Sequence, residues 1–283
     1  MIKYPIEGKS RGYLRGDEIN VFDRFERGFI PAGKYFREIT DKMTRIIRYQ
    51  WKEEIRDGLK GFLLFGPPGT GKTLLAFWTA FKLGIPESNV LYVDFGSLGE
   101  SLVGKMEKIL RNMFNECKMS PSGTFLLIFD DAESIFFSRR FAKEAWQYTL
   151  SSVFLHELDT LDTSKAAVIV TTNMPELLDP AIKDRLFPIL VLPSLEDLRE
   201  IAKARARVYK LGTDTLEKVL NAIERQYLRG ADLINELKKD PEKLLLDESG
   251  ETSKMLREKY PSVRLIEKIV INEFVQKLLK EPF

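Results

Sequence analysis

The eight residues from Gly66 to Thr73 read GPPGTGKT, and they constrain the fold of the chain more than any other segment. They match the pattern G-x-x-x-x-G-K-[ST] at every fixed position, which is typical of a loop that wraps the phosphates of a nucleotide. A short apolar run at 61–65 precedes the loop, and an apolar stretch of helix length follows it as far as Gly84. A buried strand, a glycine-rich turn and a helix are the context that this loop needs, so the sequence predicts an α/β fold with a parallel sheet.

Each part of the loop has an expected role. Glycines let main-chain N–H groups approach the phosphates, and the helix N-terminus adds partial positive charge. Lys72 is expected to reach the β and γ phosphates, and Thr73 to offer its hydroxyl to Mg²⁺. An ordinary turn before a core helix is the alternative, but Lys72 and Thr73 follow in register. The residues expected to bind nucleotide here are Gly66, Pro67, Pro68, Gly69, Thr70, Gly71, Lys72, Thr73 and Leu74.

Composition limits the classes of protein to which the chain can belong. Its 283 residues suffice for one medium domain and a smaller one. The net charge of +2 creates no global basic field for nucleic acid. The longest apolar runs are of strand length, below the roughly 20 residues that span a bilayer. No apolar leader is visible at the N-terminus, and Cys117 is the only cysteine, so we expect a cytoplasmic protein.

Strand-like and helix-like segments alternate through the middle of the chain. Helical patterns separate five apolar runs, which lie at 61–65, 89–94, 124–129, 166–172 and 188–193. This alternation predicts a parallel sheet between helices, with right-handed crossovers.

We therefore expect three parts. Residues 1–34 are polar and punctuated by glycine, which predicts an extended or mobile N-terminal arm. Residues 35–193 form the α/β domain. Residues 194–283 show only helical patterns and are expected to form a smaller all-helical domain, with a turn-rich loop excursion near 239–254.

A second motif lies at 126–131, where LLIFDD describes a hydrophobic strand that ends in two carboxylates. Asp130 is expected to hold Mg²⁺, directly or through water, and Asp131 to orient and polarise an attacking water. A strand that merely ends in a polar turn would look similar. The pairing of this Walker B pattern with the Walker A loop at 66–73 favours a nucleotide-hydrolysing site.

From about residue 60 to about residue 237, the chain resembles the AAA ATPases of the AAA+ superfamily of P-loop NTPases. The further motifs that carry the resemblance are ESLVGKMEKILRNMF at 100–114, SRR at 138–140, VIVTTNMPELLDPAIKDRLF at 168–187 and GADLINEL at 230–237. The resemblance implies a five-stranded parallel sheet between helices, followed by a helical lid domain. It also implies ATP and Mg²⁺ as ligands, and a homo-oligomer, usually a hexamer, that acts on a protein substrate or adaptor.

The resemblance assigns further roles to single residues. Asn173 matches the position whose amide contacts the γ-phosphate or the attacking water. Arg185 lies where the family carries an arginine finger that reaches the nucleotide of a neighbouring subunit. A surface salt bridge between Arg185 and Asp184 is the alternative. Gly230 and Ala231 would let the lid helix approach the adenosine closely.

The sequence also departs from the family. Asp131 stands where a glutamate is usual. The shorter side chain of aspartate withdraws the carboxylate by roughly 1–1.5 Å, and a misplacement of that size can lower the hydrolysis rate about 100-fold. We therefore expect slow but real hydrolysis, with Glu133 either assisting as a second acid or capping the helix that follows. Aligning the family's V-G on Val103 places Leu102 at a position where relatives carry an aromatic pore residue, although Leu102 could equally cover the helix start.

Three functions remain open at this point. The first is ATP-driven remodelling of a protein or protein complex through a ring. The second is a nucleic-acid-associated loader or helicase partner, for which Arg205, Arg207 and Lys210 on one helix are candidate phosphate contacts. The third is an assembly switch that binds ATP and hydrolyses it too slowly to act as a motor.

Overall fold

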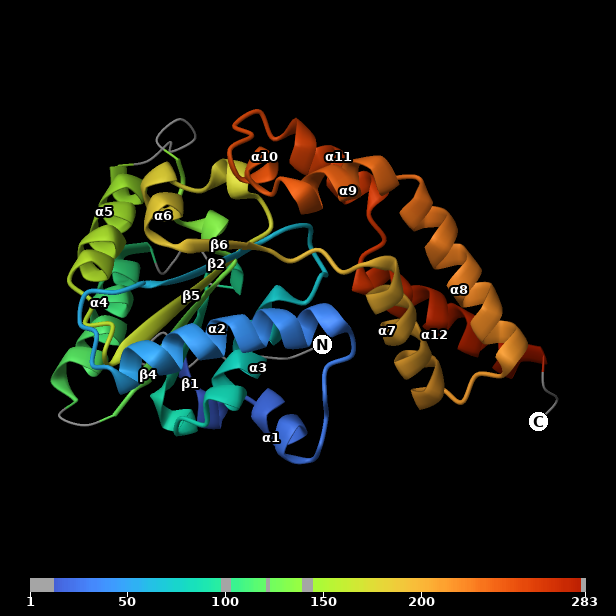
Figure 1. Cartoon of the computed structure of the whole chain (residues 1–283), viewed down its shortest axis with the longest axis horizontal. Coiled ribbons are helices and arrows are strands. Elements are labelled where there is room, and N and C mark those ends of the chain that lie inside the picture. Colours follow the sequence, from blue (N-terminus) through green and yellow to red (C-terminus); the bar gives the residue numbers. More distant parts are fainter. Residues whose placement is uncertain (1–12, 98–102, 121–122, 139–144, 281–283) are drawn as a thin grey trace.

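Five parallel strands form the centre of the computed structural model, which describes residues 13–97, 103–120, 123–138 and 145–280 (Figure 1). The six-stranded sheet has the order β1-β3-β4-β5-β2-β6. The parallel strands are β2 (Gly61–Phe65), β3 (Val90–Asp94), β4 (Phe125–Asp130), β5 (Ala166–Thr172) and β6 (Phe187–Leu190). The expected α/β fold is thereby confirmed.

The central strands are mostly apolar because helices cover the sheet. Every residue of β2, β4 and β5 is buried. Helix α2 (Lys34–Lys52) packs beside α3 (Lys72–Leu83), and α4 (Val103–Met119) packs beside α5 (Ala145–Asp159) (Figure 1). The short helix α6 (Pro180–Arg185) leads into β6. This arrangement places the carboxyl ends of all five parallel strands at one edge, where ligands of such sheets bind.

The N-terminal segment differs from the expected arm. Residues 14–15 form β1 (Leu14–Arg15), which pairs antiparallel with β3, and helix α1 (Val21–Glu26) packs on α3. Apolar burial orders this segment, because the side chains of Tyr13, Leu14 and Phe22 are buried in the core. Burial of such side chains outweighs the flexibility that the glycines favour. Residues 1–12 lie outside the described part of the chain.

The C-terminal part is helical, as expected. Its helices are α7 (Leu195–Val208), α8 (Thr213–Leu228), α9 (Ala231–Lys239), α10 (Glu242–Leu245), α11 (Glu251–Lys259) and α12 (Val263–Lys280). Helices α7, α8 and α12 pack on one another, and α10 contacts both α9 and α11 (Figure 1). The boundary between residues 193 and 194 stays a prediction; β6 ends at Leu190 and α7 begins at Leu195.

The expected loop excursion near 239–254 contains helix α10 and the start of α11. Leu244 and Leu245 are buried there, so apolar contacts order a segment whose composition is typical of turns. The Lys183 ammonium donates to the Leu245 carbonyl oxygen at 3.0 Å, and the Ser253 hydroxyl donates to Glu176 Oε2 at 2.7 Å. The C-terminal helices therefore contact the segment that follows β5.

None of the described helices combines the length and the apolar character needed to cross a membrane.

Gly61 begins β2 where the backbone of β5 approaches most closely. A Cβ atom at this position would lie 2.0 Å from the Val168 carbonyl oxygen. We expect Gly61→Ala to lower the free energy of unfolding by about 1–3 kcal/mol, because β2 and β5 must separate to admit the methyl group. Urea-induced unfolding measures this change, with Gly212→Ala as the control. No atom lies within 4 Å of a Cβ at Gly212, so equal losses in the two variants would contradict the prediction.

Candidate active site

The loop between β2 and α3 lies at the carboxyl edge of the sheet. Gly66, Gly69 and Gly71 have φ angles of +142°, +75° and +91°, a region that side chains other than glycine rarely adopt. The Thr70 hydroxyl donates to the Pro67 carbonyl oxygen at 3.1 Å and closes the turn. Helix α3 then begins at Lys72, so its N-terminus faces the space in front of the loop.

Lys72 is buried within this loop. Its ammonium donates to the carbonyl oxygens of Gly66 at 2.9 Å and Pro67 at 3.0 Å. Burial lowers the pKa of Lys72 to about 8, and the nearby carboxylates of Glu133 and Asp130 oppose that shift. An ammonium has three donors, so the third is available to an anion in front of the loop.

Thr73 and Asp130 meet across the sheet edge. The Thr73 hydroxyl lies 2.9 Å from Asp130 Oδ1 and 3.0 Å from Oδ2, and the Tyr92 hydroxyl donates to Oδ2 at 3.2 Å. Burial raises the pKa of Asp130 to about 7, although the hydrogen bond from Thr171 lowers it. A buried carboxylate beside a hydroxyl is an all-oxygen donor set, which suits Mg²⁺.

Mg²⁺ commonly takes one or two protein oxygens and completes its shell with water and substrate phosphates. Within the described residues, no cluster of three or more acidic, histidine or cysteine side chains could hold a metal ion. The pair formed by Thr73 and Asp130 therefore fits a metal that arrives with a nucleotide better than a metal held by the protein alone.

Asp131 and Asn173 are brought together by neighbouring strands. Asp131 follows β4 with a φ of +50°, and its main-chain N–H donates to the Thr171 hydroxyl at 3.2 Å. Asn173 follows β5, and its side-chain amide donates to Asp131 Oδ1 at 2.7 Å. Aspartate tolerates this left-handed backbone better than most residues. The first contact fixes the backbone of Asp131, and the second holds its carboxylate at the carboxyl edge of the sheet.

Glu133 lies behind this pair. It belongs to the short 3₁₀ helix η5 (Ala132–Ser134), and its Oε1 accepts the main-chain N–H of Asn173 at 2.9 Å. Its Oε2 is buried and has no hydrogen-bond partner among the residues that the structure describes. Burial raises the pKa of Glu133. The side chain therefore supports Asn173, a contact that neither of the two roles considered from sequence describes.

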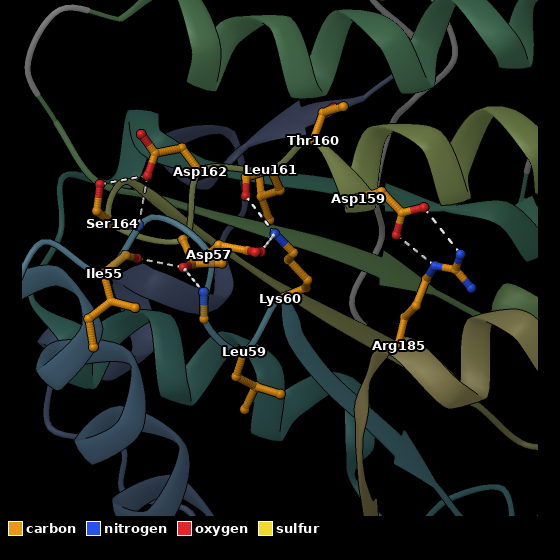
Figure 2. A network of polar contacts seen from close by, with 12 residues as sticks. Ile55, Asp57, Leu59, Lys60, Asp159, Thr160, Leu161, Asp162, Ser164 and Arg185 are labelled. Atoms are coloured by element: carbon orange, nitrogen blue, oxygen red, sulfur yellow. Dashed lines mark hydrogen bonds and ion pairs between the residues drawn. The ribbon is translucent and has the colours of Figure 1, made fainter.

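Arg185 lies at the opposite edge of the sheet from the loop of its own chain. It precedes β6, whose Phe187 pairs with Phe62 near the start of β2, whereas the loop follows the end of β2. Figure 2 shows its guanidinium facing Asp159 of α5, with Nε 2.7 Å from Oδ1. The partner is therefore Asp159, and the pairing with Asp184 considered from sequence is wrong. A role as a finger stays a prediction.

A cavity of about 310 Å³ lies beside Gly71 and Leu74. Sequence reasoning missed most of its lining, because the residues come from three distant segments: Phe29, Pro31, Ala32, Tyr35, Ile201 and Val263. The Tyr35 hydroxyl donates to the Thr70 carbonyl oxygen at 3.0 Å, which ties this wall to the loop. The cavity is largely apolar and adjoins the loop, so its position suits the base and sugar of a nucleotide.

The structure does not place the expected adenosine contacts or the expected pore residue at this site. Gly230 and Ala231 do not line the cavity, and a Cβ at Gly230 would lie 2.9 Å from Lys259 Cβ. Their contact with adenosine stays a prediction. Leu102, the expected pore position, lies outside the described residues.

Comparison with known proteins gives matches over the same region. A model of the ATPase family associated with various cellular activities (AAA) matches residues 62–194. The chain is 34% identical over 188 residues to the 26S proteasome regulatory subunit 10B homolog A of Arabidopsis thaliana, covering 62% of this chain and 45% of that protein. It is 30% identical over 243 residues to the ATP-dependent zinc metalloprotease FtsH of Methylococcus capsulatus, covering 74% of this chain and 37% of that protein. The chain thus spans less than half the length of these relatives.

Proposed function

We propose that the chain, whose residues 62–194 match the model of the AAA family of ATPases, binds ATP with Mg²⁺ and hydrolyses it to ADP and phosphate. The observation that carries the proposal is the meeting of three groups at one edge of the sheet: Lys72 in its loop, Thr73 with Asp130, and Asp131 with Asn173.

Each group has a distinct task in the proposed reaction. Lys72 and the loop N–H groups bind and orient the triphosphate. Thr73 and Asp130 would hold Mg²⁺, which neutralises charge on the phosphate oxygens when it is bound. Asp131 orients and polarises the attacking water and accepts its proton, and Asn173 keeps the Asp131 carboxylate in place through the 2.7 Å hydrogen bond. The rate is expected to be low, because Asp131 is shorter than the glutamate usual at this position.

We further propose that the chain couples this turnover to remodelling of a protein or protein complex in a homo-oligomeric ring, with a hexamer favoured. The names of its relatives support a protein substrate, since they include a proteasome regulatory subunit and an ATP-dependent zinc metalloprotease. The distance of Arg185 from the loop of its own chain supports an oligomer, because the guanidinium could serve only a neighbour's nucleotide.

The alternatives differ in their support. A nucleic-acid-associated role has little support, because Arg205, one of its candidate phosphate contacts, forms an ion pair with Glu267 and also lines the cavity beside the loop. A slow assembly switch is favoured by the short side chain of Asp131. DNA binding that weakens steeply with salt would support the first alternative. Turnover of a few per hour in a ring that forms only with ATP would support the second.

Equilibrium binding and sizing test the proposal together. We expect the chain to bind ATP in the presence of Mg²⁺, to lose affinity when EDTA removes the metal, and to form a larger particle with ATP than with ADP in light scattering. Absence of ATP binding would contradict the proposed function. Binding without a change of size would contradict only the ring.

A further inference from the structure

A single buried hydroxyl joins the two carboxylate residues at the end of β4. Thr171 lies in β5, which pairs with β4, and only 1% of its surface is exposed. Its hydroxyl donates to Asp130 Oδ1 at 2.5 Å and accepts the main-chain N–H of Asp131 at 3.2 Å. Thr171 therefore contacts both the residue expected to hold Mg²⁺ and the residue expected to activate water.

The chemistry of the partners sets the direction of each hydrogen bond. An ionised carboxylate only accepts, and a main-chain N–H only donates. The Thr171 hydroxyl gives its one hydrogen to Asp130, and a lone pair remains for the N–H of Asp131. Valine has nearly the same shape and suits a buried strand, as Val168 and Val170 show in β5 itself. Packing alone therefore does not require a hydroxyl at position 171.

The contact with Asp131 bears on the direction of its side chain. Asp131 has φ of +50° and ψ of +48°, a left-handed backbone that residues with a side chain adopt only at a cost. Two contacts hold this backbone: the Thr171 hydroxyl accepts its N–H, and the Ser134 N–H donates to its carbonyl oxygen at 2.9 Å. The backbone angles determine where the side chain leaves the chain, so these contacts help to aim the carboxylate.

Asp130 depends less on Thr171 than Asp131 does. The Thr73 hydroxyl lies 2.9 Å from Asp130 Oδ1, and the Tyr92 hydroxyl donates to Oδ2 at 3.2 Å. Removal of the Thr171 hydroxyl would leave Asp130 these two partners, but it would take away the acceptor that the structure gives the Asp131 N–H. The main consequence should therefore fall on Asp131.

We propose that Thr171 is a positioning residue, which holds the backbone of Asp131 and thereby aims its carboxylate at the attacking water. The inference rests on the proposed hydrolysis of ATP and adds a residue to which the resemblance gives no role. It also explains how a short acid can serve where a longer one is usual, because a backbone held by the neighbouring strand gives the aspartate a defined place. A misplacement of about 1 Å can lower a rate on the order of 100-fold, so this support matters to turnover.

Hydrolysis by Thr171→Val and Thr171→Ser, measured over a range of ATP concentrations, tests the inference. Valine keeps the shape and removes the hydroxyl, whereas serine keeps the hydroxyl. We expect Thr171→Val to lower kcat at least about tenfold with KM within about twofold of the wild type, and Thr171→Ser to keep most of the rate. Thr79→Val is the matched control, because Thr79 is equally buried and its hydroxyl donates to the Leu75 carbonyl oxygen within α3.

Binding of ATP at increasing Mg²⁺ concentration gives a readout that does not depend on turnover. We expect Thr171→Val to bind ATP as the wild type does and to need the same Mg²⁺ concentration, because Thr73 and Tyr92 still contact Asp130. A higher Mg²⁺ requirement, combined with a wild-type rate at saturating metal, would show that Thr171 acts through Asp130 and would contradict the proposal.

The remaining outcomes separate this inference from the proposed function. A wild-type kcat in Thr171→Val contradicts the role of Thr171 alone, and so do equal losses in the valine and serine variants, which would indicate packing. If the wild type fails to hydrolyse ATP, the proposed function itself is wrong, and the role of Thr171 falls with it. Thermal unfolding without nucleotide shows whether each variant is folded.

Discussion

Replacing Asp131 with asparagine is expected to lower the steady-state rate of ATP hydrolysis by at least about 100-fold, the usual contribution of a positioned general base. Asparagine keeps an oxygen that can accept the Asn173 amide, which donates to Asp131 Oδ1 at 2.7 Å in the structure. The variant should therefore fold and bind ATP as the wild type does, and lose only the negative charge that polarises the water. Phosphate release and ATP titration, made on the same preparation, measure the two effects.

Two companion variants sharpen this result. Asp131→Glu restores the longer acid and is expected to hydrolyse ATP at least as fast as the wild type, because it moves the carboxylate towards the phosphates. Glu133→Gln keeps the hydrogen bond from the Asn173 main chain and should have a much smaller effect than Asp131→Asn. A wild-type rate in Asp131→Asn together with a large loss in Glu133→Gln would transfer the role of base to Glu133.

Replacing Arg185 with alanine is expected to lower the hydrolysis rate by about 10³-fold or more, as loss of an arginine finger does. Binding of ATP by the same subunit should persist, since Arg185 lies at the sheet edge opposite the loop of its own chain. Stability should change little, because the ion pair with Asp159 is solvent-exposed and such pairs contribute under about 1 kcal/mol. Arg225→Ala, which removes an exposed arginine of α8, is the matched control.

A mixing experiment shows whether Arg185 acts on a neighbour. Arg185→Ala subunits keep an intact loop, and Lys72→Met subunits keep an intact Arg185. Each variant alone should be inactive, whereas a mixture should recover part of the wild-type rate. A mixture that stays inactive, although mixed oligomers form, would contradict action between subunits.

The five parallel strands could be predicted because each is a continuous apolar run bounded by polar or glycine residues, as at 61–65 and 166–172. The two-residue strand β1 could not, since so short a segment carries no periodic pattern and exists only through its pairing with β3. The same holds for α10, where two buried leucines order a segment whose residues favour turns.

The candidate site likewise contains contacts that could be predicted from the sequence and contacts that could not. Lys72 and Thr73 are neighbours in one motif, and Asp130 ends a strand whose parallel alignment brings it to the loop, so local spacing was sufficient. The contact between Asp131 and Asn173 follows from the pairing of β4 with β5, an order of strands that the structure shows and that the sequence analysis did not predict. The hydrogen bond from the Val263 main-chain N–H to the Gly69 carbonyl oxygen depends on how α12 packs on α7, and no local pattern encodes that docking.

Phosphate release from ATP, by the wild type and by Lys72→Met prepared side by side, tests the central claim most directly. The account predicts slow release that requires Mg²⁺ in the wild type and none above background in Lys72→Met, because the variant lacks the ammonium that is held between the Gly66 and Pro67 carbonyl oxygens. Equal release from the two proteins, or none from the wild type when it is folded and supplied with Mg·ATP, would contradict it.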